Sequence, residues 1–247
     1  MEAITCCSSL EVVRQGSMTL NDLQQLFAEI DLTSSRKLGQ NFLIDQNISK
    51  WIVDQLEIDP GDTVVEVGPG AGALTREIVD RTGKFILVER DGRLASFLAN
   101  RLGERPEVTV HQMDAVQFDT RQLYPLQPVK LIGNLPYSAG GEIIRNFLGQ
   151  HSPVSGAVLM LQKEVALRIC AQPRTKAFGV LSLRIQARWE ARVLKNVGPA
   201  NFYPRPQVES TVISLTPRDP ESLPNFDLRE FDSVIRRGFS QRRKQLK

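Results

Sequence analysis

Short apolar runs alternate with amphipathic segments along most of the chain from Thr63 onward. Apolar runs of roughly four to eight residues predict strands, whereas a 3.6-residue apolar period predicts helices. We expect strands at 63–68, 84–89, 108–113, 129–133, 156–161, 181–188 and 210–216. We expect helices near 48–56, 73–81, 93–102, 142–150 and 163–170. This alternation predicts an α/β fold with a mostly parallel sheet covered on both faces, its last two strands forming an antiparallel edge pair.

Both ends of the chain depart from this alternation. The first 17 residues show no clear period, and Met18 is a candidate start of the protein. Residues 18–30 place apolar side chains on one helical face, with Thr19 or Asn21 as a possible cap. After the proline-rich stretch 216–226, a new helix is expected from about Leu228. One helix cannot form its own core, so we expect only the start of a C-terminal helical domain here.

Composition narrows the class of protein. The chain has 247 residues, a net charge of +3, three cysteines and two histidines. Neither the cysteine nor the histidine spacing fits a disulfide framework or a metal site. No apolar run approaches the roughly 20 residues that span a bilayer, and the N-terminus lacks a signal-peptide layout. We therefore expect a cytoplasmic protein without a metal, while the basic last dozen residues suggest a polyanionic partner.

A glycine-rich turn follows the first expected strand of the sheet. Gly68, Gly70 and Gly72 occur in VVEVGPGAGALT, at the carboxyl end of a strand, where open α/β sheets bind ligands. Glycine there lets the backbone approach a ligand closely. The spacing alone is also compatible with a dinucleotide site or with a simple tight turn.

Carboxylates at successive strand ends favour S-adenosyl-L-methionine over NAD. Glu89 ends the second strand, where a carboxylate can accept both ribose hydroxyls. Glu66 lies inside the first strand, where it can orient the glycine turn or an ammonium group. Asp114, followed by Ala115, can accept from an adenine amino group. An NAD-linked oxidoreductase is disfavoured, because the sequence offers no proton donor near a hydride acceptor and places Pro69 inside the glycine turn.

The stretch IGNLPYSAGG follows the fourth strand and would lie beside the same cofactor. The side-chain oxygen of Asn134 and the carbonyl of Leu135 can accept both hydrogens of an exocyclic amine. Pro136 restricts the preceding backbone, and Tyr137 offers a face for stacking a base. This is chemistry by positioning and electrostatics. Phe202, with its neighbour, is a candidate second aromatic wall.

Five motifs resemble the ribosomal RNA adenine N6-dimethyltransferase family in order and spacing. They are KLGQNFLID, VEVGPGAGALT, GNLPY, LMLQKEVALRI and FYPRPQVEST, and the resemblance covers about residues 36–247. The chain resembles the small-subunit, KsgA-like branch most. The resemblance implies a class I S-adenosylmethionine-dependent methyltransferase, with a Rossmann-like seven-stranded sheet. It also implies dimethylation of two adjacent adenines in the 3′-terminal hairpin of small-subunit rRNA, within a pre-ribosomal small subunit.

The resemblance also assigns site residues and domains. The family's cofactor contacts fall on Asn41, Leu43, Gly68, Glu89, Asp114 and Asn134. Its catalytic loop falls on residues 134–137, and the aromatic thought to stack on the target adenine falls on Phe202. Arg36 and Lys37 could meet phosphate. The expected divisions are an N-terminal extension (1–35), a catalytic domain (36–217), and a linker with the first rRNA-binding helix (218–247).

Two departures and two alternatives accompany this assignment. The loop continues with the small residues 138–141, which we expect to loosen the rear wall of the pocket. Compared with the family, we also expect most of the C-terminal domain to be missing, which should weaken RNA binding. The alternatives are a large-subunit rRNA adenine methyltransferase of the resistance type, and a small-subunit assembly factor with weak or lost methylation. We expect a monomer.

Overall fold

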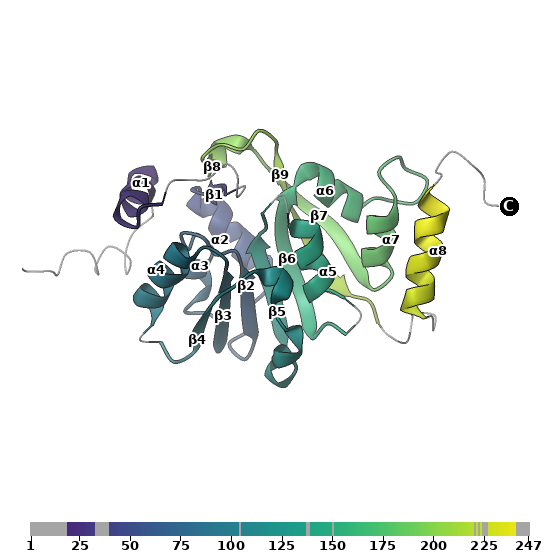
Figure 1. The fold of residues 1–247 in the computed structure, drawn as a ribbon, viewed down its shortest axis with the longest axis horizontal. Coiled ribbons are helices and arrows are strands. Elements are labelled where there is room, and N and C mark those ends of the chain that lie inside the picture. Colours follow the sequence, from purple (N-terminus) through teal and green to yellow (C-terminus); the bar gives the residue numbers. More distant parts are fainter. Residues whose placement is uncertain are drawn as a thin grey trace, which may run out of the picture.

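The computed structural model describes residues 19–32, 40–103, 105–136, 139–149, 151–219, 221, 223 and 227–240. The expectations for residues 1–18, for Arg36 and Lys37, for Tyr137 and for the end of the last helix lie outside these residues. Figure 1 shows one α/β body, with α1 at one end and α8 at the other.

The main sheet has seven strands in the order β4-β3-β2-β5-β6-β9-β7. Only β9 runs against its neighbours, pairing antiparallel with both β6 and β7. A separate two-stranded ribbon joins β1 to β8. The strands are β1 (Phe42–Leu43), β2 (Thr63–Val67), β3 (Lys84–Glu89), β4 (Val108–Gln112), β5 (Val129–Asn134), β6 (Val154–Gln162), β7 (Trp189–Val197), β8 (Phe202–Tyr203) and β9 (Ser210–Pro217).

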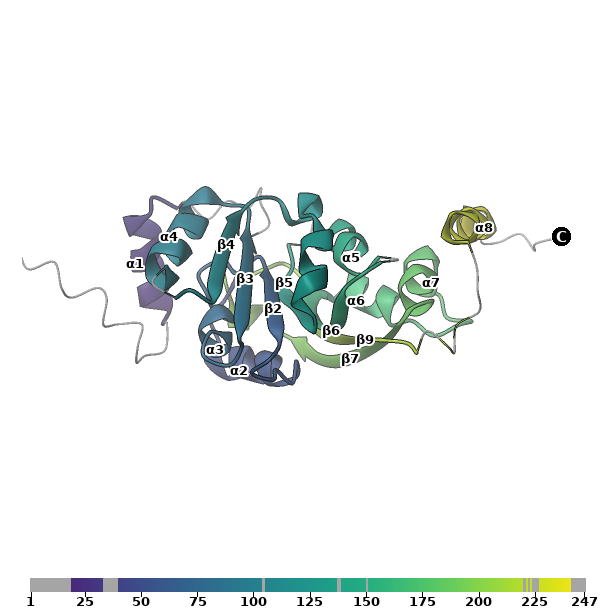
Figure 2. The ribbon, with the colours of Figure 1, turned by 90° about the horizontal axis from the view of Figure 1, so that it is seen from below.

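Helices cover both faces of the sheet, with α2 and α3 on one side and α5 and α6 on the other (Figure 2). The α-helices are α1 (Leu20–Glu29), α2 (Gln46–Asp54), α3 (Thr75–Ile78), α4 (Gly92–Leu102), α5 (Gly140–Phe147), α6 (Lys163–Ile169), α7 (Val180–Gln186) and α8 (Leu228–Ser240). Short 3₁₀ segments are η2 (Ala115–Gln117), η3 (Thr120–Leu126) and η4 (Pro199–Asn201).

Two apolar layers follow from the alternation of side chains along the strands. Val65 and Val67 of β2 face a layer shared with α5 and α6, whereas Val64 faces a layer shared with α2, α3 and α4. All five residues of β2 are buried, as expected for a central strand covered on both faces. The parallel β2–β5 contact thus lies at the centre of the body, and the ends of these two strands reach one edge together.

Six of the seven expected strands are confirmed, but the one expected at 181–188 is wrong. Residues 180–186 form α7, because Ser182 and Ile185, three positions apart, are the side chains that the fold buries. The Ser182 hydroxyl also joins this helix to α6 by donating to the Arg168 carbonyl at 2.5 Å. The edge strand that pairs with β9 is β7, whose charged, exposed positions conceal the strand pattern.

The helix behind the amide-containing loop is fixed at both ends. The carbonyl of Pro136 accepts the N–H of Gly140 at 3.0 Å, at the start of α5. At the other end, the ring N–H of buried Trp189 donates to the carbonyl of Leu148 at 3.0 Å. These bonds satisfy backbone groups that a helix leaves without partners at its ends.

The helix at the carboxyl end starts at Leu228, as expected, and contacts the rest through α7. The guanidinium of Arg184 donates two hydrogen bonds of 2.6 Å to the carboxylate of Asp232. In the part of the chain that the structure describes, no helix combines the length and apolar character needed to cross a membrane. The described residues also contain no group of three or more His, Cys, Asp or Glu arranged to hold a metal.

Candidate cofactor and methyl-transfer site

A cavity of about 570 Å³ opens at the carboxyl ends of the parallel strands. Its volume lies within the roughly 300–1,000 Å³ typical of small-molecule sites. The structure brings eight of the predicted site residues together in its wall: Asn41, Leu43, Gly68, Glu89, Asp114, Asn134, Leu135 and Pro136. Sequence positions almost a hundred residues apart therefore contribute to one site.

The glycine turn approaches the cavity through backbone that other residues rarely adopt. Gly68 and Gly70 have φ values of +68° and +57°. At Gly70, an added Cβ would lie 3.1 Å from the ring of Phe42, so a side chain there would be both strained and crowded. The turn leads into α3, which begins at Thr75, later than the expected start near residue 73.

Glu89 receives backbone donors from both sides of the cavity. One carboxylate oxygen accepts the N–H of Gly70 at 3.0 Å, and the other accepts the N–H of Asp91 at 2.8 Å. Each carboxylate oxygen can accept more than one hydrogen bond, so both keep capacity for ligand hydroxyls. Burial raises the pKa of Glu89, and the backbone donors partly offset this. Glu89 is thus oriented before any ligand arrives.

Glu66 is the second buried carboxyl group in the wall. It is 1% exposed and accepts the Thr75 hydroxyl hydrogen at 2.8 Å. Burial raises its pKa to about 8, and the neighbouring Glu89 charge adds to the increase. Near neutral pH this group holds a proton, and a bound cation would favour its ionised form.

Asp114 begins η2 and accepts the N–H of Val116 at 3.0 Å, which fixes the carboxylate at the cavity wall. The guanidinium of Arg90 lies 3.7 Å from it. Ala115, the neighbour of Asp114, also lines the cavity. Asp114 therefore supplies a hydrogen-bond acceptor that suits the edge of an adenine, and Ala115 supplies a small apolar surface that suits its face.

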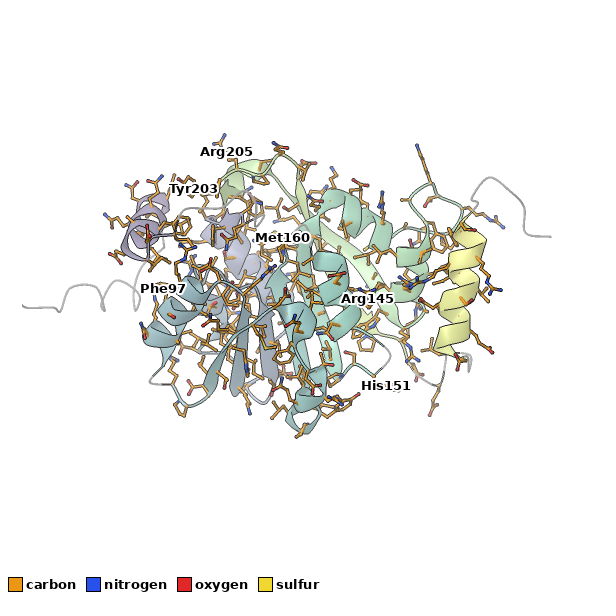
Figure 3. The ribbon with its side chains drawn as sticks, in the orientation of Figure 1. Phe97, Arg145, His151, Met160, Tyr203 and Arg205 are labelled. Atoms are coloured by element: carbon orange, nitrogen blue, oxygen red, sulfur yellow. The ribbon has the colours of Figure 1, made fainter. Side chains whose placement is uncertain are left out.

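The amide of Asn134 ends β5 and faces the segment that precedes α2. Its Nδ2 donates to the Asn41 carbonyl at 3.0 Å. The N–H of Leu135 donates to the Met160 carbonyl at 3.0 Å, which holds the loop against β6. Figure 3 labels Met160 in the middle of the molecule. The loop backbone is therefore fixed where it meets the cavity.

Phe202 occupies a different place from the other described candidates. It is 2% exposed, pairs across the β1–β8 ribbon with Leu43, and belongs to the same buried cluster as Leu43 and Met160. It does not line the cavity as the structure stands. Its stacking role stays a prediction, because a ring in this position must turn outward to meet a base.

The cavity residues that were missed from the sequence include Gln40, Phe42 and Asp91. Gln40 and Phe42 lie within the motif KLGQNFLID, and Asp91 caps α4 by accepting the N–H of Arg93 at 3.0 Å. The Gln40 side-chain oxygen is buried and has no hydrogen-bond partner among the residues that the structure describes. Such an acceptor suits a ligand that carries donors. A helix-cap pattern after Glu89 could have identified Asp91.

The wall residues fit S-adenosyl-L-methionine. Glu89 can accept ribose hydroxyls, Asp114 can accept from an adenine amine, and the orphaned Gln40 oxygen offers one more acceptor. The reversed β9 within an otherwise parallel seven-stranded sheet is the arrangement of class I S-adenosylmethionine-dependent methyltransferases. This protein is a methyltransferase of that class.

Comparison with known proteins identifies the family. The model of the ribosomal RNA adenine dimethylase family matches residues 32–247, so the chain belongs to that family. It is 43% identical over 222 residues to ribosomal RNA small subunit methyltransferase A of Chlorobium phaeobacteroides, covering 89% of this chain and 80% of the relative. It is 41% identical over 229 residues to the protein of that name from Alkaliphilus oremlandii, covering 90% and 79%.

Solved structures agree with the fold. A dimethyladenosine transferase from Plasmodium falciparum superposes with a TM-score of 0.72 at 27% identity, covering 83% of this chain and 73% of that one. The 23S rRNA methyltransferase ErmE superposes with a TM-score of 0.66 at 28% identity, covering 81% and 80%. The expected class I fold is confirmed.

Proposed function

We propose that the protein dimethylates the N6 amines of two adjacent adenines in the 3′-terminal hairpin of small-subunit rRNA. The observation that carries this proposal is the position of Asn134 and Pro136 in the wall of the cavity that Glu89 and Asp114 also line. The relatives named ribosomal RNA small subunit methyltransferase A support the choice of rRNA and of the small subunit.

The chemistry assigned to the chain is positioning. When bound, S-adenosyl-L-methionine supplies an electrophilic methyl group. The Oδ1 of Asn134 and the carbonyl of Leu135 accept the two amine hydrogens, which favours a tetrahedral nitrogen with its lone pair directed at that methyl. Because Nδ2 of Asn134 already donates to Asn41, its oxygen is turned to the opposite side of the amide. No strong general base is required, since fixed dipoles stabilise the developing charge.

The target adenine must leave its stack to reach the cavity, at a cost of a few kcal/mol. We assign Tyr137 and Phe202 to stacking of this base, as the family resemblance implies. We assign Asn41, Leu43, Gly68, Glu89 and Asp114 to the cofactor. Residues 36–217 are proposed as the catalytic domain, after an N-terminal extension (1–35).

Residues 218–247 are proposed as a linker and the first helix of an rRNA-binding domain. Exposed Arg236 and Arg237 of α8 can contact phosphate. We further propose that the enzyme acts as a cytoplasmic monomer on a pre-ribosomal small subunit.

The test is transfer of labelled methyl groups from S-adenosylmethionine to small subunits that lack the modification. Modified positions are mapped by primer extension. We expect label on two adjacent adenines, its loss in Asn134→Ala, and normal transfer in the matched control Asn100→Ala, whose side chain is exposed on α4. Subunit binding without transfer in the wild type would instead identify an assembly factor.

The second candidate function is methylation of large-subunit rRNA, which the superposition on ErmE favours. The same assay with protein-free 23S-type RNA distinguishes the two. Label on that RNA, with none on the small subunit, would reverse the assignment.

A further inference from the structure

The first helix lies directly behind one wall of the cofactor cavity. Leu23, Leu26 and Phe27 are the buried residues of α1. They form one apolar cluster with Phe42, Ala71 and Leu94, and these three residues also line the cavity. Phe42, Ala71 and Leu94 therefore each lie between α1 and the cavity.

One line of contacts runs from α1 to the glycine turn. The rings of Phe27 and Phe42 meet edge to face, with centroids 4.8 Å apart. Phe42 in turn lies against Gly70, where an added Cβ would be 3.1 Å from its ring. The N–H of Gly70 donates to Glu89. Packing of Phe27 thus limits where the glycine turn and its carboxylate partner can move.

A second line of contacts starts just after α1. The guanidinium of Arg93 donates to the Asp31 carbonyl at 2.5 Å and forms a 3.2 Å ion pair with Asp91. The N–H of Asp91 donates to the other oxygen of Glu89 at 2.8 Å. Both lines therefore end on the same carboxylate, one at each of its oxygens.

The ribbon β1–β8 supports the same arrangement. Phe42 pairs with Tyr203 across the ribbon, and the ring of Tyr203 lies 6.3 Å from that of Phe27. Figure 3 labels Tyr203 on the side of β8 nearest α1. Phe27, Phe42 and Tyr203 thus belong to one apolar cluster that joins α1 to the ribbon.

We infer that residues 20–31 act as an N-terminal clasp that holds the glycine turn and Glu89 in the arrangement that binds S-adenosylmethionine. Phe27 is its positioning residue and makes no contact with the ligand. The inference rests on the proposed function, because it takes S-adenosylmethionine as the occupant of the cavity. Coupling is reciprocal, so cofactor binding should in turn strengthen docking of the clasp.

The test measures cofactor affinity and clasp docking separately. Calorimetry with S-adenosylmethionine on the full chain gives Kd, and amide hydrogen exchange of residues 20–31 reports docking. We expect Phe27→Ala to raise Kd by about 10-fold, within the roughly 5–150-fold of typical couplings. The matched control Leu167→Ala, a 43% exposed leucine on α6 and outside the clasp, should stay within about twofold of wild type. The cofactor should slow exchange of the clasp in wild type and in Leu167→Ala, but not in Phe27→Ala.

A second variant guards against loss of folding in Phe27→Ala. Thr19 and Asp22 form a capping box at the start of α1, and neither residue lines the cavity. Thr19→Ala should fray the helix and raise Kd in the same direction while the rest of the protein stays folded. In steady-state kinetics, KM for the cofactor should rise in both variants, with kcat at saturation unchanged.

The outcomes separate the clasp from the proposed function. Wild-type affinity in Phe27→Ala and Thr19→Ala, or clasp exchange unaffected by the cofactor, would overturn the inference and leave the function standing. Absence of S-adenosylmethionine binding by the wild type would overturn the proposed function and remove the ligand on which the clasp depends.

Discussion

The side chain of Asn134 donates to the backbone of Asn41 across 3.0 Å, joining the end of β5 to the segment before α2. Both residues line the cavity, one in the proposed catalytic loop and the other in the segment proposed to contact the cofactor. This bond turns the side-chain oxygen of Asn134, the acceptor proposed for the substrate amine, away from Asn41. In the proposed function, substrate positioning and cofactor binding therefore share one hydrogen bond.

Asn134→Asp tests that shared bond. The carboxylate keeps an acceptor oxygen but loses the N–H donor, and it places negative charge against the Asn41 carbonyl. We expect kcat to fall about 100-fold or more, on the scale of losing one preorganised polar group. Cofactor affinity should also weaken, because the segment at Asn41 loses a contact. Single-turnover transfer and calorimetry measure the two effects; full activity would show that the donor is dispensable.

The buried Glu66 should make stability depend on pH. Its pKa in the folded protein is about 8, against an ordinary 4.5, so the folded state holds a proton that the unfolded state releases between these values. Stability should therefore fall as pH rises from about 4.5 to about 8. Glu66→Gln lacks this group, so the wild type should lose stability relative to it by a few kcal/mol, at about 1.4 kcal/mol per pKa unit.

Urea unfolding of both proteins at a series of pH values measures that difference. The comparison is needed because burial also raises the pKa of Glu89. A difference that stays constant across the range would mean that Glu66 ionises normally in the fold.

Two glycines near the catalytic loop should respond in opposite ways to alanine. At Gly133 an added Cβ would lie 2.5 Å from the Val67 carbonyl oxygen, which belongs to the neighbouring strand and cannot move freely. We expect Gly133→Ala to lower the free energy of unfolding by about 1–3 kcal/mol. At Gly141 an added Cβ would have no described atom within 4 Å apart from its chain neighbours and its own helix backbone, so Gly141→Ala should stabilise α5 by about 0.5–1 kcal/mol. Denaturant unfolding of both variants measures the difference. Equal changes in the free energy of unfolding would contradict the close packing of Gly133 against Val67.

Phe202→Leu separates stacking from packing. Leucine fills much of the buried volume, so stability should fall by less than about 1.5 kcal/mol. Loss of an aromatic face for the base should lower the rate of transfer by about 5- to 150-fold, matching the roughly 1–3 kcal/mol of a base–aromatic stack. Tyr203→Leu, the next residue in β8, serves as the comparison. An unchanged rate in Phe202→Leu would leave this ring only a packing role against Leu43.

Much of the fold was predictable because its strands are apolar and strictly spaced. The central runs at 63–67 and 84–89 are buried throughout or nearly so; the first precedes the glycine turn at Gly68, and the second ends at Glu89. The failure at 181–188 has a physical cause, since alternating Leu181, Leu183 and Ile185 fit a strand locally. The helix is instead stabilised by the burial of Ser182 and Ile185 and by the hydrogen bond from Ser182 to α6, neither of which shows in the local pattern.

The site was predictable only in part. Glu89, Asp114 and Asn134 end successive strands, so their meeting follows from the topology of a parallel sheet. Asn41 and Leu43 came from the family resemblance, because a strand of two residues has no periodicity to detect. The orphaned oxygen of Gln40 and the packing of Phe27 on Phe42 exist only in three dimensions.

The two tryptophans of the chain have different surroundings, and this makes them distinct optical probes. Trp189 is 3% exposed and bonded to the end of α5, so its emission should shift only when the core behind the catalytic loop opens. Trp51 is half-buried on α2, with the Lys195 ammonium 4.3 Å from its ring centroid, and should respond to changes at the surface. Replacing Trp51 with phenylalanine would leave Trp189 as the single tryptophan, and its emission wavelength would follow the integrity of the end of α5.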